Sequence, residues 1–156
     1  MKYTRLTKEQ FEELHQEFIN FLATQSITAE EWDDIKKNKP KVAEQELDVF
    51  SDLVWEGVLA QAKFLENISQ QHLYLFHLME THISLIGLKI LNESVDLTTR
   101  SGFNWLRENL MSDDVELFQS EKKYSEDKQA DKFELIQQGS VITKGELFKY
   151  FMKLIG

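Results

Sequence analysis

The sequence predicts an α+β domain in which a small antiparallel sheet packs with about six helices. Two observations predict it. Residues 72–91 form the most apolar stretch of the chain, and segments with helical periodicity lie on both sides of it. We expect strands at about residues 72–79, 83–91 and 115–120, all within one globular domain spanning residues 1–156. The alternative is an all-helical bundle in which residues 72–91 form a buried central helix.

The apolar stretch favours strands over a helix for two reasons. Its residues are apolar at both odd and even positions, as in a sheet that is covered on both faces. No capping sequence precedes it, and Gly87 would cost a helix interior about 1 kcal/mol, whereas glycine is common at a bulge or a close backbone approach. Against strands, residues 79–82 lack the Asn-Gly or Asp-Gly of a tight hairpin. A helical stripe through Leu75, Met79 and Leu85 therefore remains the alternative.

Composition limits the class of protein. The chain has 156 residues and no cysteine, and its 18 Lys and Arg against 27 Asp and Glu give a net charge of −9. An acidic chain repels phosphate backbones, so we expect no nucleic-acid partner. Glu80 and Lys89 interrupt the apolar stretch, and each would cost roughly 2.5–3.5 kcal/mol near a bilayer centre, so we expect no membrane span. The N-terminal residues lack the apolar run of a signal peptide, which makes a cytoplasmic protein the expectation.

Three segments share a helix-capping pattern in which a threonine is followed three residues later by Glu or Gln. They begin at Thr7, Thr28 and Thr143, each flanked by an apolar pair. The pattern and the helical periodicity predict helices at about residues 8–23, 29–37, 41–68, 99–110, 126–138 and 144–155. The helix over residues 41–68 is apolar over more than half its circumference, so we expect it to pack on two sides. In this arrangement it covers one sheet face with the N-terminal helices, and the later helices cover the other face.

The second half of the chain carries a resemblance. Its motifs are DLTT at residues 96–99 with GFNWL at 102–106, YSEDK at 124–128, FELIQQG at 133–139 and ITKGEL at 142–147. With these motifs the sequence resembles a family of small acidic bacterial proteins that is classed as a domain of unknown function. The resemblance implies a bacterial cytosolic protein and extends over nearly the full length. It implies no activity, cofactor or catalytic residue.

Histidines and a carboxylate in the apolar stretch are the best candidates for metal ligands. They are His72, His77, Glu80 and His82. Imidazole and carboxylate groups suit zinc, iron or manganese, and a hairpin would bring His77 and His82 together across its turn. The spacing of five matches no compact helical ligand motif. The alternative interpretation is that these histidines lie at the edge of a covered sheet.

The remaining motifs favour an interaction protein over an enzyme, although they leave an enzyme open. The sequence contains no Gly-x-Ser-x-Gly elbow and no glycine-rich phosphate loop, and it predicts no catalytic or cofactor-binding residue. We therefore expect a non-enzymatic adaptor that binds a protein partner or forms a homodimer. The alternative is a metal-binding protein or a metal-assisted enzyme that uses His72, His77, Glu80 and His82. The candidate interaction surface comprises Trp105, which lies off the apolar stripe of its helix, and Val115 and Leu117 in the predicted edge strand.

The capping pattern generates a stability prediction. Replacing Thr28 by alanine removes the hydroxyl that caps the helix beginning at residue 29. We expect Thr28→Ala to lower the free energy of unfolding by about 1 kcal/mol. Urea denaturation followed by circular dichroism measures this change, and an unchanged midpoint would contradict the assigned cap.

Overall fold

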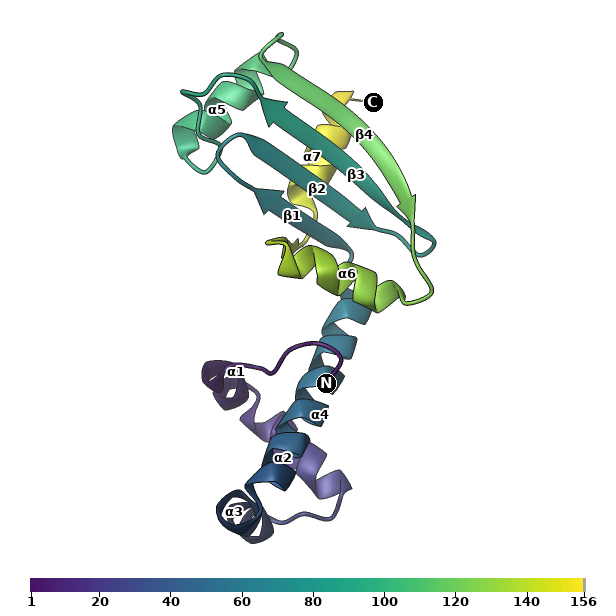
Figure 1. The fold of residues 1–156 in the computed structure, drawn as a ribbon. Coiled ribbons are helices and arrows are strands. Elements are labelled where there is room, and N and C mark those ends of the chain that lie inside the picture. The colour runs from purple at the N-terminus through teal and green to yellow at the C-terminus, as the bar shows by residue number, and fades with distance from the viewer. Residues whose placement is uncertain (156) are drawn as a thin grey trace. The chain divides into compact units, whose positions relative to one another are not determined.

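A computed structural model describes residues 1–155, which form two compact units (Figure 1). The N-terminal unit comprises residues 1–60, and the C-terminal unit begins at Gln61. The α+β prediction is confirmed, and the all-helical alternative is wrong, because residues 72–91 form two strands. That the two units act as the single globular domain expected from the sequence stays a prediction.

The N-terminal unit is entirely helical. Its helices are α1 (Lys8–Glu13), α2 (His15–Thr24), α3 (Ala29–Asn38) and α4 (Pro40–Gln61). The single helix predicted over residues 8–23 is interrupted at Leu14, whose backbone (φ −101°, ψ 23°) leaves the helical region. Phe18 is the centre of the core, with its ring 5.2 Å from that of Trp32 and 5.1 Å from that of Phe50. Aromatic packing therefore joins α2, α3 and α4.

Two of the three predicted caps form. The Thr7 hydroxyl accepts from the Gln10 N–H while the Gln10 side chain accepts from the Thr7 N–H, which completes a capping box. The Thr28 hydroxyl accepts from the Glu31 N–H at 3.1 Å. The third prediction is wrong, because Thr143 ends a strand and its hydroxyl accepts from the Gly145 N–H, two residues later.

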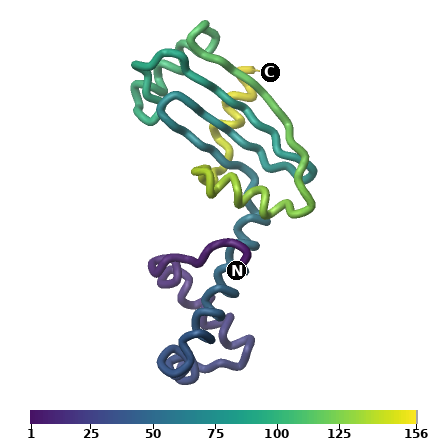
Figure 2. The backbone as a smooth tube through the Cα atoms, viewed as in Figure 1, coloured from purple at the N-terminus to yellow at the C-terminus, as the bar shows by residue number. Residues whose placement is uncertain are grey.

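The C-terminal unit is built on a five-stranded antiparallel sheet in the order β4-β3-β2-β1-β5. The strands are β1 (Phe64–Ile68), β2 (His72–Leu78), β3 (His82–Ile90), β4 (Val115–Lys123) and β5 (Val141–Thr143). Figure 2 follows β1 to β4 as successive antiparallel passes of the chain. The three predicted strands are confirmed as β2, β3 and β4, and β4 lies at an edge of the sheet.

Strands β1 and β5 were not predicted from the sequence. The predicted helix over residues 41–68 is too long, since α4 ends at Gln61 and the chain turns into β1 within two residues. Strand β1 lies between β2 and β5. The neighbouring strands therefore supply the hydrogen bonds that a longer helix would have made locally, and this tertiary pairing overrides the helical pattern.

Each sheet face has its own helical cover. We call one the α7 face; its buried side chains include Leu73, Leu75, Ile86 and Leu88, and helices α5 (Arg100–Asn109) and α7 (Glu146–Ile155) cover it (Figure 1). The other is the α6 face, where Leu65, Leu78 and Ile83 pack beneath α6 (Lys128–Gln137). The later helices thus cover both faces, not the single face that the sequence analysis assigned to them.

Gly87 and Gly102 both permit close approaches in the C-terminal unit. The ring of Phe118 lies directly over Gly87, where a Cβ atom would come within 2.1 Å of it, so the predicted close approach involves a ring on the neighbouring strand. At Gly102, in the first turn of α5, a Cβ atom would lie 1.7 Å from the carbonyl oxygen of Asp96. That oxygen belongs to the turn that caps the helix and has little freedom to move, since it also accepts from Thr99.

The contact at Gly102 predicts a large loss of stability on adding one methyl group. We expect Gly102→Ala to destabilise the C-terminal unit by about 1–3 kcal/mol, because backbone must move to admit the new carbon. Gly57 in α4 is the matched control, since a Cβ atom there would meet nothing within 4 Å. Gly57→Ala should stabilise by roughly 0.5–1 kcal/mol through helix propensity. Urea midpoints for the two variants should therefore shift in opposite directions, and equal shifts would contradict the packing at Gly102.

Candidate functional site

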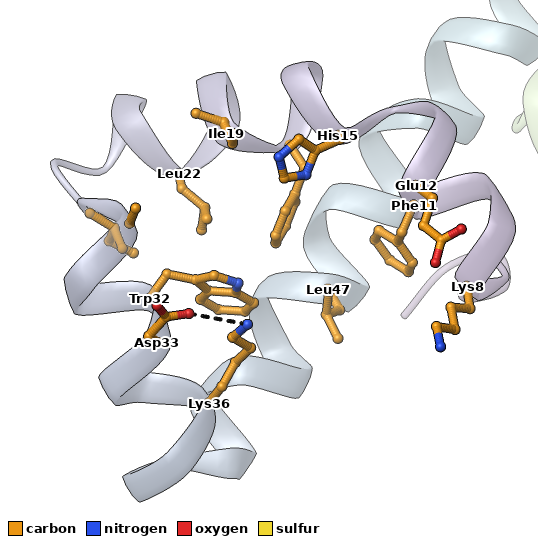
Figure 3. A pocket seen from close by; sticks show the side chains of 13 residues that line it. Lys8, Phe11, Glu12, His15, Ile19, Leu22, Trp32, Asp33, Lys36 and Leu47 are labelled. Carbon is orange, nitrogen blue, oxygen red and sulfur yellow. Dashed lines mark ion pairs between the residues drawn. The ribbon is translucent and has the colours of Figure 1, made fainter.

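An apolar pocket of the N-terminal unit lies between α2 and α3, with Leu47 of α4 also in its lining (Figure 3). Its volume is about 760 Å³. Leu22 and Trp32 point into it from opposite sides, and Phe11 of α1 lines its far end. Ile19 of α2 also lines it and is 41% exposed, and the sequence analysis did not identify it as a site residue.

Charged and polar side chains lie at the mouth of this pocket. Lys8, Glu12, His15, Asp33 and Lys36 line it and are all exposed. Asp33 and Lys36 form an ion pair at 3.3 Å along one turn of α3. The buried and half-buried lining is apolar, so the pocket has the composition of a site that binds apolar groups and holds no buried polar group for chemistry.

A second pocket, of about 770 Å³, lies on the α7 face of the sheet beside α7. His77 of β2 and His82 of β3 both line it, together with Ser84, Glu121 of β4 and Met152 of α7. The register explains this, because His77 pairs with Ser84, and Ser84 pairs with Glu121. His82 lies two residues from Ser84 and therefore shares its face. The hairpin does bring His77 and His82 to one place.

The two histidines of this pocket differ in their surroundings. The His77 ring stacks on Phe64 with centroids 4.4 Å apart and meets the edge of Phe148 at 5.3 Å. Burial lowers the pKa of His77, and the nearby charges of Lys149 and His82 lower this pKa further. His82 lies at the open side, where its Nε2 is 3.6 Å from a carboxylate oxygen of Glu121. These surroundings therefore favour the neutral form of His77.

The four predicted metal ligands do not form one cluster. His72 lies on the α6 face, where its ring stacks against Tyr74 at 5.9 Å, and Glu80 is exposed in the hairpin turn. Only His77 and His82 share a pocket. Within residues 1–155, no group of three or more His, Cys, Asp or Glu side chains is positioned to hold a metal ion.

The predicted interaction residues are half-buried and pack against the core of the C-terminal unit. Trp105, Val115 and Leu117 contact the cluster beneath the α7 face. The Val115 and Leu117 side chains point inward, and the exposed ring in this strand is that of Phe118, which sequence reasoning did not single out. Strict alternation along the strand was the signal that could have identified Phe118.

The comparisons with known proteins identify a family. A model of a family of unknown function, DUF6495, matches residues 1–156. The chain belongs to this family. The predicted resemblance to a family of unknown function is thereby confirmed. No curated protein and no solved structure shows significant similarity to this DUF6495 chain. No helix within residues 1–155 is both long and apolar enough to cross a membrane.

The environment of His77 predicts a pH dependence of stability. The unfolded chain, in which a histidine titrates near pH 6.5, binds this proton more readily than the folded chain does. The free energy of unfolding should therefore be highest above about pH 6.5 and should decrease as the pH falls below that value. His77→Phe retains a stacking ring and should make this decrease less steep, and Lys149→Gln should reduce it in part.

Urea midpoints measured between about pH 5 and about pH 7.5 test this dependence. Each variant is compared with the native chain at every pH, so that the contributions of the other histidines cancel. An identical slope in His77→Phe would show that this residue does not take up a proton on unfolding.

Proposed function

We propose that this DUF6495 chain is a non-enzymatic interaction module whose N-terminal unit binds an apolar helix face of a protein partner. The observation that carries the proposal is the apolar pocket between α2 and α3. Phe11 and Trp32 are half-buried and Ile19 is exposed, so these three side chains offer apolar surface to an incoming side chain. Exposed apolar surface of this kind, bordered by polar residues, is typical of protein-interaction sites.

The shape of the pocket supports a helical partner. Its two walls are the helices α2 and α3, and α4 contributes Leu47. Grooves bounded by helices accept amphipathic helices, whose anchors recur every three or four residues. Ile19 and Trp32 lie on opposite walls and would contact the two sides of such a helix.

The charges at the mouth support the same partner. Lys8 and Glu12 lie at one end, and the Asp33–Lys36 ion pair lies at the other. Each end thus carries one charge of each sign. This arrangement favours a partner with an apolar centre over a strongly charged ligand, because no single sign of charge is attracted. A cytoplasmic location, which the acidic, cysteine-free composition supports, is part of this proposal.

The proposal predicts that one substitution in the pocket weakens binding of the partner. Ile19→Glu places a carboxylate in the apolar pocket, where the native side chain is 41% exposed. The control, Val49→Glu, places a carboxylate on α4 outside the pocket, where the native side chain is 52% exposed. Both variants should fold. Immobilised native, Ile19→Glu and Val49→Glu chains are incubated with one lysate, and the bound proteins are compared by quantitative mass spectrometry. We expect a partner retained by Val49→Glu and weakened about tenfold or more by Ile19→Glu.

Anilinonaphthalene sulfonate, a fluorescent apolar probe, tests the pocket without a known partner. Its fluorescence should rise equally with the native chain and Val49→Glu, and less with Ile19→Glu. Equal signals from all three chains, together with identical sets of bound proteins, would refute the pocket as the binding site.

A further inference from the structure

The edge strand β4 offers a second interaction surface, which is independent of the proposed function. β4 is nine residues long, and within residues 1–155 β3 is its only neighbour in the sheet. All its residues except Val115 and Leu117 are exposed. A long edge strand without proline presents unpaired backbone groups, to which another strand can pair.

The hydrogen bonds of β3 show which backbone groups of β4 point outward. The Ile90 N–H donates to Gln71, on the β2 side of the sheet, and the next residue, Leu91, donates at 2.7 Å to Asp114, immediately before β4. In an antiparallel pair these directions alternate along the strand. Odd-numbered residues of β3 therefore bond to β4, and their partners in β4 are the even-numbered residues. The N–H and C=O groups of Leu117, Gln119 and Glu121 consequently face outward.

We propose that β4 pairs antiparallel with β4 of a second copy of this chain, about a two-fold axis at Gln119. In this register every outward-facing residue meets an outward-facing residue, as backbone pairing requires. Glu116 then lies opposite Lys122 of the second copy, and the symmetry repeats this contact. Both side chains are exposed and project on the α6 face, so each pair can form an ion pair across the new strand boundary.

The same register covers the exposed aromatic ring of the strand. Phe118 is 44% exposed on the α6 face, where its ring lies over Gly87 and meets Tyr74 at 6.3 Å. In the dimer, Phe118 pairs with Ser120 of the second copy. The two Phe118 rings become diagonal neighbours, a spacing that aromatic side chains bridge. Self-pairing therefore joins the two sheets into one and reduces the exposure of both rings.

Charge exchange provides the test. Sedimentation equilibrium on the full chain at low salt should show a dimer. Glu116→Lys and Lys122→Glu each place like charges opposite one another twice, and each should weaken the dimer about tenfold. The double exchange Glu116→Lys/Lys122→Glu should restore native affinity. An equimolar mixture of the two single variants should also form a heterodimer with native affinity.

Two further variants separate this interface from other surfaces. Gln119→Pro removes an outward N–H that does not bond to β3 and should prevent dimerisation. Ile19→Glu, in the pocket of the N-terminal unit, should leave the dimer affinity unchanged, so failure of the proposed function and failure of this proposal are distinguishable. Circular dichroism checks that each variant is folded. A native chain that stays monomeric, or a dimer that the charge variants do not alter, would overturn the proposal.

Discussion

The register between β2 and β3 is the constraint on which the C-terminal unit depends. His77 pairs with Ser84 and Leu75 with Ile86, so odd-numbered residues of β2 share a face with even-numbered residues of β3. Apart from His77, His82 and Ser84, both sets are apolar, so most of this face must be covered from water. A slip by one residue would move every one of these side chains to the other face and bring His77 and His82 to opposite sides. The covers by α5 and α7 on one face and by α6 on the other follow from this single register.

Much of the fold could be predicted from the sequence because its signals are local. The caps at Thr7 and Thr28 depend on residues only three positions apart. The apolar run that begins at His72 can likewise be recognised without knowing which other segments contact it. The end of α4 could not be predicted in this way. Phe64, Leu65 and Ile68 continue a helical pattern, and no Gly or Pro lies within residues 61–68. The pairing of β1 with β2 and β5 makes this segment a strand. The predicted helix cap at Thr143 was wrong for the same reason, because the pairing of β5 with β1 makes this segment a strand.

The candidate sites were less predictable because they depend on contacts between distant segments. The apolar pocket needs residues from four helices, and in the sequence alone Ile19 is one apolar residue among many. For the histidines, the sequence shows which residues share a face within one strand. It does not show which residues of β2 share a face with which residues of β3. His72 and His82 have the same parity, yet the hairpin register separates them and unites His77 with His82. The hairpin prediction thus gave the convergence of His77 and His82, whereas the separation of His72 from them required the register.

The charge pattern of β4 bears on how natural edge strands avoid uncontrolled pairing. Its acidic Glu116 and its basic Lys122 lie at opposite ends of the same face, separated by Phe118 and Ser120. Parallel pairing with a second copy would place Glu116 against Glu116 and Lys122 against Lys122, which is repulsive at both ends. Antiparallel pairing about Gln119 places opposite charges together, and a shift of register by two residues removes both contacts. The same two side chains thus favour the antiparallel pairing about Gln119 and disfavour the parallel and shifted pairings. Selection between these pairings depends on the difference between their free energies. A two-fold pairing also uses each β4 edge once, so assembly stops at two copies.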